Sequence, residues 1–153
     1  MLVQHKKDSS SVVLAIPAGG VPIAYVLSKR LSLPFDITIT RKLHVPWNQE
    51  VGFGAITWNG LVEINRHLVK HLCLSDCQIE KVIEKEKRVI EYRRNRYNKQ
   101  KFPCLEDIHT IIVDDGLASG FTMLTTARAF RLYNPEKITV AVPTAPLRSI
   151  ERI

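Results

Sequence analysis

One stretch of the sequence decides the fold: Ile111-Ile112-Val113-Asp114-Asp115-Gly116-Leu117-Ala118-Ser119-Gly120-Phe121-Thr122-Met123. Its apolar first part, which begins at 108 and ends at 113, is typical of a buried strand, and Asp114-Asp115-Gly116 ends that strand. The small residues after it lead into a helix expected from about 122 to 132. The stretch therefore predicts a strand, a loop and a helix in direct succession.

The same succession occurs earlier in the chain. An apolar run at 11–16 is stopped by Pro17-Ala18-Gly19-Gly20, and residues 21–31 then have helical spacing. Further strands are expected at 36–40, ending in the cationic pair Arg41-Lys42, and at 137–142. Strands that alternate with helices predict an α/β fold with a mostly parallel sheet, helices on both faces and right-handed crossovers. Ligands of such sheets bind beyond the carboxyl ends of the strands.

The middle of the chain has a different pattern. Asn59-Gly60 lies between two short apolar runs in the segment 53–64, which predicts a β-hairpin outside the main sheet. Two helices should follow, one over 66–72 with Asn65 as its cap and a longer one that begins at a capping box of Ser75 and Gln78. The longer helix has an apolar stripe made of Ile79, Val82, Ile83, Val89, Ile90 and Tyr97.

Composition limits the class of protein. With 153 residues, 45% apolar and 24% charged, the chain is long enough for one core, and we expect a single domain over 1–153. The polar start and the lack of a long apolar window predict a cytoplasmic protein without a membrane partner. Three cysteines, an odd number, favour reduced thiols. The net charge of +7 favours anionic partners such as phosphates, nucleotides or nucleic acid.

The acidic pair and the loop after it have specific chemical requirements. Asp114 and Asp115 leave a buried strand together, which is costly unless cations or hydroxyl groups are supplied. A ribose diol with a divalent metal ion would supply both. The loop can direct successive N–H groups at an anion beside a helix N-terminus, and Ser119 and Thr122 add hydroxyl donors. These requirements together match a ribose 5-phosphate.

This stretch resembles the phosphoribosyl pyrophosphate signature of the type I phosphoribosyltransferases. The segments 15–24 and 40–43 are similar to the corresponding parts of a bacterial and archaeal branch of predicted phosphoribosyltransferases, so the resemblance covers most of the chain. It implies that Asp114 and Asp115 hold the ribose hydroxyls. The pyrophosphate loop would be Ala18, Gly19 and Gly20. The 5-phosphate would lie in the loop formed by Gly116, Leu117, Ala118, Ser119, Gly120, Phe121 and Thr122.

The resemblance implies a reaction in which a nitrogen nucleophile, expected to be a nucleobase, takes the phosphoribosyl group and pyrophosphate is released. Mg²⁺ would be held through the substrate near Asp114 and Asp115. One departure concerns Ala18, because members of this branch usually have arginine there. The missing pyrophosphate contact would then come from Arg41 or Lys42, which we assign to the catalytic set. A mobile hood inserted at about 44–64 would exclude water, with Trp47, Glu50, Phe53 and Trp58.

Several alternatives stay open. A non-catalytic regulator on the same fold could sense a nucleotide and bind RNA through one basic face, made of Tyr92, Arg93, Arg94, Arg96, Tyr97, Lys99 and Lys101. A zinc site is conceivable at His67, His71, Cys73 and Cys77, and His44 could touch substrate. Neither Gly116-x-x-x-Gly120 nor Gly52-Phe53-Gly54 fits a nucleotide-binding glycine motif. A receiver-type acidic pair is expected after the first strand and not after the third.

The last residues predict a helix that begins near Leu147 after Pro146, with no strand after it. A parallel sheet that ends in this way would have an uncovered edge and an apolar flank. We therefore expect that a C-terminal part is missing and that the chain alone is weakly active or inactive. It should either form a homodimer through that flank or be marginally stable.

Overall fold

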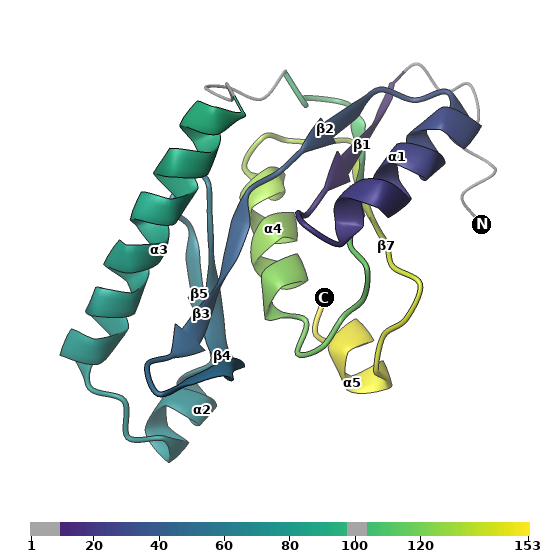
Figure 1. Ribbon diagram of the computed structural model, residues 1–153. Coiled ribbons are helices and arrows are strands. Elements are labelled where there is room, and N and C mark those ends of the chain that lie inside the picture. Colours follow the sequence, from purple (N-terminus) through teal and green to yellow (C-terminus); the bar gives the residue numbers. More distant parts are fainter. Residues whose placement is uncertain (1–9, 98–103) are drawn as a thin grey trace.

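The structure is a computed structural model that describes residues 10–97 and 104–153. Its main sheet has four parallel strands in the order β2-β1-β6-β7 (Figure 1). Their bounds are Ser11–Ala15 for β1, Phe35–Ile37 for β2, His109–Val113 for β6 and Lys137–Ala141 for β7. This confirms the predicted α/β fold with a mostly parallel sheet.

Each face of the main sheet has its own covering layer, because successive strand residues point to opposite faces. Helix α1 (Gly20–Leu31) covers one face, where Val13 and Ile111 pack against Ala24 and Leu31. The other face meets α4 (Phe121–Arg131) and a second sheet, and side chains such as Leu14 join the larger core there. Figure 1 shows α1 and α4 on opposite sides of the strands.

The second sheet is antiparallel and contains β3 (Thr40–Val45), β4 (Asn48–Thr57) and β5 (Val62–Ile64). The predicted hairpin is confirmed, since β4 and β5 pair across a turn in which Gly60 has a φ of +86°. The expected strand at 36–40 is wrong in its bounds. It ends at Ile37, and Arg41 and Lys42 lie inside β3 because the chain starts a new sheet at Thr40.

Two helices follow the second sheet. In α2 (Arg66–His71) the Asn65 side chain accepts a hydrogen bond from the N–H of Leu68 at 3.1 Å, as predicted. The longer α3 (Asp76–Arg96) begins at the predicted capping box of Ser75 and Gln78 and packs against β3 and β4. Tyr97 does not continue the apolar stripe. It follows the last helical residue and is exposed, so that part of the stripe was wrong.

The aromatic residues expected in a mobile hood separate into two groups. Phe53 is fully buried, and Trp58 is buried with its ring centroid 4.4 Å from that of Phe130 on α4. Their assignment to a water-excluding hood is therefore wrong, because Phe53 lies in the buried half of β4 and Trp58, which follows that strand, packs on Phe130. Trp47 and Glu50 are exposed near the β3–β4 turn.

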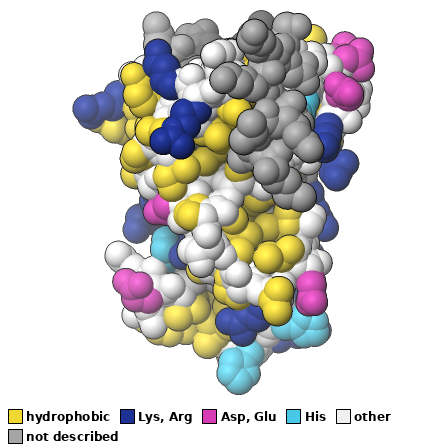
Figure 2. All heavy atoms as spheres, turned by 90° about the vertical axis from the view of Figure 1, so that its right-hand side faces the viewer, with side chains coloured by type: hydrophobic (Ala, Val, Ile, Leu, Met, Phe, Trp, Pro, Cys, Tyr) yellow, Lys and Arg dark blue, Asp and Glu magenta, His cyan; other side chains and the backbone are white. Residues whose placement is uncertain are grey.

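Strand β7 forms one edge of the main sheet, and α5 (Leu147–Ile150) follows it. An open groove of about 940 Å³ runs beside β7, lined mainly by apolar side chains that include Ile23, Leu27 and Val140. Figure 2 faces this side and shows hydrophobic side chains over much of the surface. Pairing with a second copy through this flank stays a prediction, which sedimentation at increasing concentration would test. Within the described residues no helix is long and apolar enough to cross a membrane.

Candidate functional site

The candidate site lies where three parallel strands end. The N–H of Ile16 donates to the carbonyl of Val113 at 2.9 Å, and the N–H of Asp114 donates to the carbonyl of Ala141 at 3.3 Å. The loops after β1 and β6 therefore start from hydrogen-bonded neighbours. This is the edge of an α/β sheet at which ligands bind.

The two loops touch each other through Asp115 and Gly19. A Cβ atom built on Gly19 would lie 1.8 Å from Oδ2 of Asp115, so the carboxylate occupies the space of a side chain. A Cβ atom on Gly20 would lie 2.5 Å from the carbonyl oxygen of Val113. The peptide bond between Pro17 and Ala18 is cis, and Ala18 is exposed. The predicted acidic pair and the predicted pyrophosphate loop thus form one continuous surface.

The two aspartates differ in burial. Asp114 is half-buried and accepts a hydrogen bond from the N–H of Asp115 at 2.9 Å, whereas Asp115 is exposed. Burial, and to a smaller extent the charge of Asp115, raise the pKa of Asp114 to about 6, although the N–H of Asp115 acts in the opposite direction. A cation or a pair of hydroxyl donors at this position would favour the charged form.

The loop from Gly116 to Thr122 joins the acidic pair to α4. Leu117 is buried and its N–H donates to the carbonyl of Thr144 at 3.0 Å, while Ala118 and Ser119 are exposed. Gly120 has a φ of +81°, a backbone conformation that favours glycine, and it directly precedes the first residue of α4. The unsatisfied N–H groups of a helix start are suited to a phosphate.

The remaining predicted catalytic residues, Arg41 and Lys42, lie on the second sheet. Nε of Arg41 is 2.7 Å from Oε2 of Glu86 on α3, and Glu86 is only 5% exposed. The side chain of Lys42 lies directly over Gly52. Burial, and next the charge of Lys42, lower the pKa of nearby His44. Neither of these contacts involves Asp114 or Asp115, so the catalytic roles of Arg41 and Lys42 stay predictions.

Two other expected surfaces can be placed. Within 10–97 and 104–153 no three His, Cys, Asp or Glu side chains are grouped so that they could hold a metal ion, and this range includes all four residues weighed for zinc. On the basic face of α3, Arg94 donates to the carbonyl of Trp58 at 3.4 Å and Tyr92 is exposed. Lys99 and Lys101 lie outside the described residues.

Sequence reasoning missed the residues that contact the long loop from the far end of the chain. These are Thr144, Ser149 and Arg152, which all contact residues within 116–121. No local pattern marks them, because α4 and β7 separate them from the loop along the sequence. Arg152 is the one charged residue among the three.

The chain is similar to known proteins in sequence and in fold. The family model of the phosphoribosyl transferase domain matches residues 2–153. Predicted phosphoribosyl transferases from two strains of Mycobacterium tuberculosis, H37Rv and CDC 1551, are each 36% identical over 140 residues. The match covers 88% of this chain but only 31% of each relative, so the chain spans about a third of their length.

Solved structures show the same fold. The protein TT1426 from Thermus thermophilus has a TM-score of 0.71 and 26% identity, over 99% of this chain and 74% of that one. A purine phosphoribosyltransferase from Pyrococcus horikoshii has a TM-score of 0.55 and 12% identity, over 97% and 69%, and supports the fold alone. With its family model matched over nearly the whole length, the chain belongs to the phosphoribosyl transferase family.

Proposed function

We propose that this chain binds phosphoribosyl pyrophosphate at the ends of β1 and β6 and transfers its phosphoribosyl group to a nitrogen nucleophile. The observation that carries the proposal is the contact between Asp115 and Gly19, which joins an acidic pair to a glycine loop. A ligand with a sugar diol between two phosphate groups matches that combination. Membership of the family supports the same ligand.

Each part of the site has a distinct role in this proposal. Asp114 and Asp115 accept hydrogen bonds from the ribose hydroxyls, and the N–H groups of 116–122 bind the 5-phosphate. The loop 17–20 faces the pyrophosphate. The adjacent carboxylates are hard oxygen donors that fit Mg²⁺, and a cation beside them would offset the burial that raises the pKa of Asp114. When bound, Mg²⁺ would neutralise charge on the departing pyrophosphate.

The proposed reaction is a substitution at the anomeric carbon. The bond from that carbon to the pyrophosphate oxygen breaks, and a bond to the acceptor nitrogen forms. The ribose becomes positively charged in the transition state, so the nearby carboxylates stabilise it and the loops keep the two ends of the substrate in place. The acceptor is proposed to be a nucleobase.

Calorimetric titration with phosphoribosyl pyrophosphate, with and without Mg²⁺, tests the binding step. We expect Mg²⁺-dependent binding by the parent and no measurable binding by the double variant Asp114→Asn, Asp115→Asn. Both asparagines keep the size of the parent side chains, so the melting temperature should not fall. Equal affinity in parent and double variant would show that the acidic pair has no role in binding.

A second assay tests the transfer step. Pyrophosphate release is measured with a panel of nucleobases, phosphoribosyl pyrophosphate and Mg²⁺. Release that depends on one base identifies the acceptor. Binding without release for any base would favour the alternative of a non-catalytic regulator, whose RNA binding should weaken steeply as the salt concentration rises.

A further inference from the structure

The 5-phosphate loop is held from one side by the short segment that follows β7. Ser149 is fully buried, and its Oγ donates to the carbonyl of Ala118 at 2.7 Å. Nη1 of Arg152 donates to the carbonyl of Ser119, the next residue along the loop. Two consecutive carbonyl groups of the loop are therefore engaged by two side chains of one distant segment.

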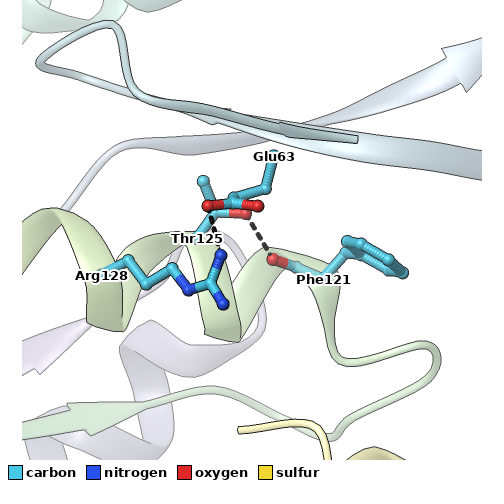
Figure 3. Close-up of polar contacts among 4 residues, drawn as sticks. All are labelled: Glu63, Phe121, Thr125 and Arg128. Carbon is cyan, nitrogen blue, oxygen red and sulfur yellow. Dashed lines mark hydrogen bonds and ion pairs between the residues drawn. The ribbon is translucent and has the colours of Figure 1, made fainter. Parts of the chain in front are cut away.

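The first turn of α4 is held by the same arginine. The guanidinium carbon of Arg152 lies 4.8 Å from the centroid of the Phe121 ring, within the range of a cation–π contact. Figure 3 shows this ring pointing away from α4, while the carbonyl of Phe121 accepts a hydrogen bond from Thr125 at 2.6 Å. Phe121 is thus fixed on its helix side by Thr125 and on its ring side by Arg152.

The geometry of a trans peptide determines what these contacts do to the loop. The C=O and N–H groups of one trans peptide unit point in opposite directions. Because the carbonyls of Ala118 and Ser119 point to the segment after β7, the N–H groups of Ser119 and Gly120 point away from it. Among residues 10–97 and 104–153, no hydrogen bond from either N–H group is present.

We propose that Arg152 is a positioning residue for the 5-phosphate loop, with Ser149 as its neutral partner. Arg152 holds the carbonyl of Ser119 and the ring of Phe121, and so keeps two N–H groups directed at the phosphate before the ligand arrives. This inference rests on the proposed function, since it assigns those N–H groups to the phosphate of a phosphoribosyl ligand. Arg152 itself does not need to touch the ligand.

The test compares two probes in the full chain. Ribose 5-phosphate reports on the long loop, and inorganic pyrophosphate with Mg²⁺ reports on the loop 17–20. Arg152→Ala should weaken ribose 5-phosphate binding about tenfold, the effect of losing one charge-assisted hydrogen bond, and leave pyrophosphate binding unchanged. Arg152→Lys should restore part of the affinity, because an ammonium group can still donate to the carbonyl of Ser119.

Arg148→Ala provides the matched control. Arg148 is an exposed arginine of α5, so its removal changes the net charge equally but leaves the loop contacts intact. We expect it to bind both probes like the parent. An equal loss of ribose 5-phosphate affinity in Arg148→Ala and Arg152→Ala would show that general electrostatic attraction explains the effect. An equal loss of affinity for both probes in Arg152→Ala would show a merely structural role. Either result overturns the proposal.

Amide hydrogen exchange without ligand tests the positioning by itself. The hydrogen-bonded amides on either side of the loop are those of Leu117 and Leu124, which donate to the carbonyls of Thr144 and Gly120. Their exchange should be faster in Arg152→Ala than in the parent or in Arg148→Ala. Unchanged exchange would overturn the inference whatever the ligand proves to be. If the parent bound neither phosphoribosyl pyrophosphate nor ribose 5-phosphate, the proposed function would fail, and the exchange rates would still decide whether Arg152 holds the loop.

Discussion

The two loops of the candidate site are both proposed to bind a phosphate group, but they are built in different ways. Both follow a buried strand of the parallel sheet and both lead into a helix. The loop 17–20 is short, and its shape depends on the close approach of Gly19 to Asp115 and of Gly20 to the backbone of Val113. The longer loop from 116 to 122 is instead held by groups that arrive from 144–152.

This difference separates two ways in which a phosphate loop can be made rigid. A loop fixed by close contacts at its glycines has no room for a further side chain there, so a single methyl group disturbs it. A loop fixed by distant side chains tolerates local change better. A Cβ atom on Gly116, for example, would lie 3.2 Å from a methyl group of Thr144 and 3.6 Å from its carbonyl oxygen, so a small shift would make room for it. Such a loop is sensitive to substitutions far away in the sequence.

The largest expected effect is that of Gly19→Ala. The new methyl group would occupy the position of the Asp115 carboxylate, which must rotate away from the diol. We expect binding of phosphoribosyl pyrophosphate to weaken about 100-fold, as for a misplaced group in a preorganised site. Calorimetry measures the loss, and thermal melting should show a stable protein because Asp115 is exposed.

Gly116→Ala is the matched change in the longer loop, and its affinity should stay within a few-fold of that of the parent. A loss as large as that of Gly19→Ala would show that the two loops do not differ in their tolerance of a methyl group.

Acidity should affect the longer loop through Asp114. With a pKa of about 6, Asp114 takes up a proton below that pH and loses the charge proposed to bind the sugar hydroxyls. Affinity for phosphoribosyl pyrophosphate with Mg²⁺ should therefore be about tenfold lower at pH 5 than at its plateau above pH 7. Titrations across this range, with inorganic pyrophosphate as the control ligand, measure the difference.

The same pKa predicts how stability depends on pH. Because the pKa is raised in the folded state, the folded protein holds a proton that the unfolded chain releases between pH 4 and 6. The contribution of Asp114 to stability is thus present at low pH and is lost as the pH rises through about 6. Asp114→Asn should be more stable than the parent at pH 7, with a difference that shrinks towards pH 4 in denaturant titrations. A variant less stable than the parent at pH 7 would contradict the assigned cause.

Ala18→Arg should strengthen binding at the proposed pyrophosphate loop. Position 18 is exposed beside Gly19, and a guanidinium there could contact pyrophosphate with two N–H groups. A charge-assisted contact contributes about 1–3 kcal/mol, so we expect affinity for pyrophosphate to rise about fivefold or more. Ala18→Gln tests whether charge is required. No gain in either variant would mean that side chains at position 18 point away from the pyrophosphate.

The smallest effect is expected away from both loops. Glu63 on β5 and Arg128 on α4 form an ion pair of 2.6 Å between the two layers (Figure 3). The arginine side chain is 53% exposed, so water screens the pair, and Glu63→Gln should change the free energy of unfolding by less than about 1 kcal/mol. Binding at both loops should be unchanged. A large loss of ribose 5-phosphate affinity would instead show that the second sheet influences the phosphate loop.

Local signals allowed the main elements to be predicted from the sequence. The apolar run that ends at Asp114, the turn at Asn59-Gly60 and the capping box at Ser75 each depend on residues only a few positions apart. Their physical causes are strand burial, the backbone freedom of glycine and the unsatisfied N–H groups of a helix start. For the same reason, the two strand-to-helix loops could be predicted from the sequence, whereas their roles in binding phosphate groups stay predictions.

The tertiary structure alone decided which distant residues meet. Arg41 pairs with Glu86, Trp58 packs on Phe130 of α4, and Arg152 holds the carbonyl of Ser119. The sequence contains all of these residues, but each contact depends on strand register and on the packing of layers that are far apart along the chain. Periodicity shows which faces are apolar, whereas the partner of each face is chosen only when all layers pack together, because burial stabilises the whole arrangement and not its separate parts.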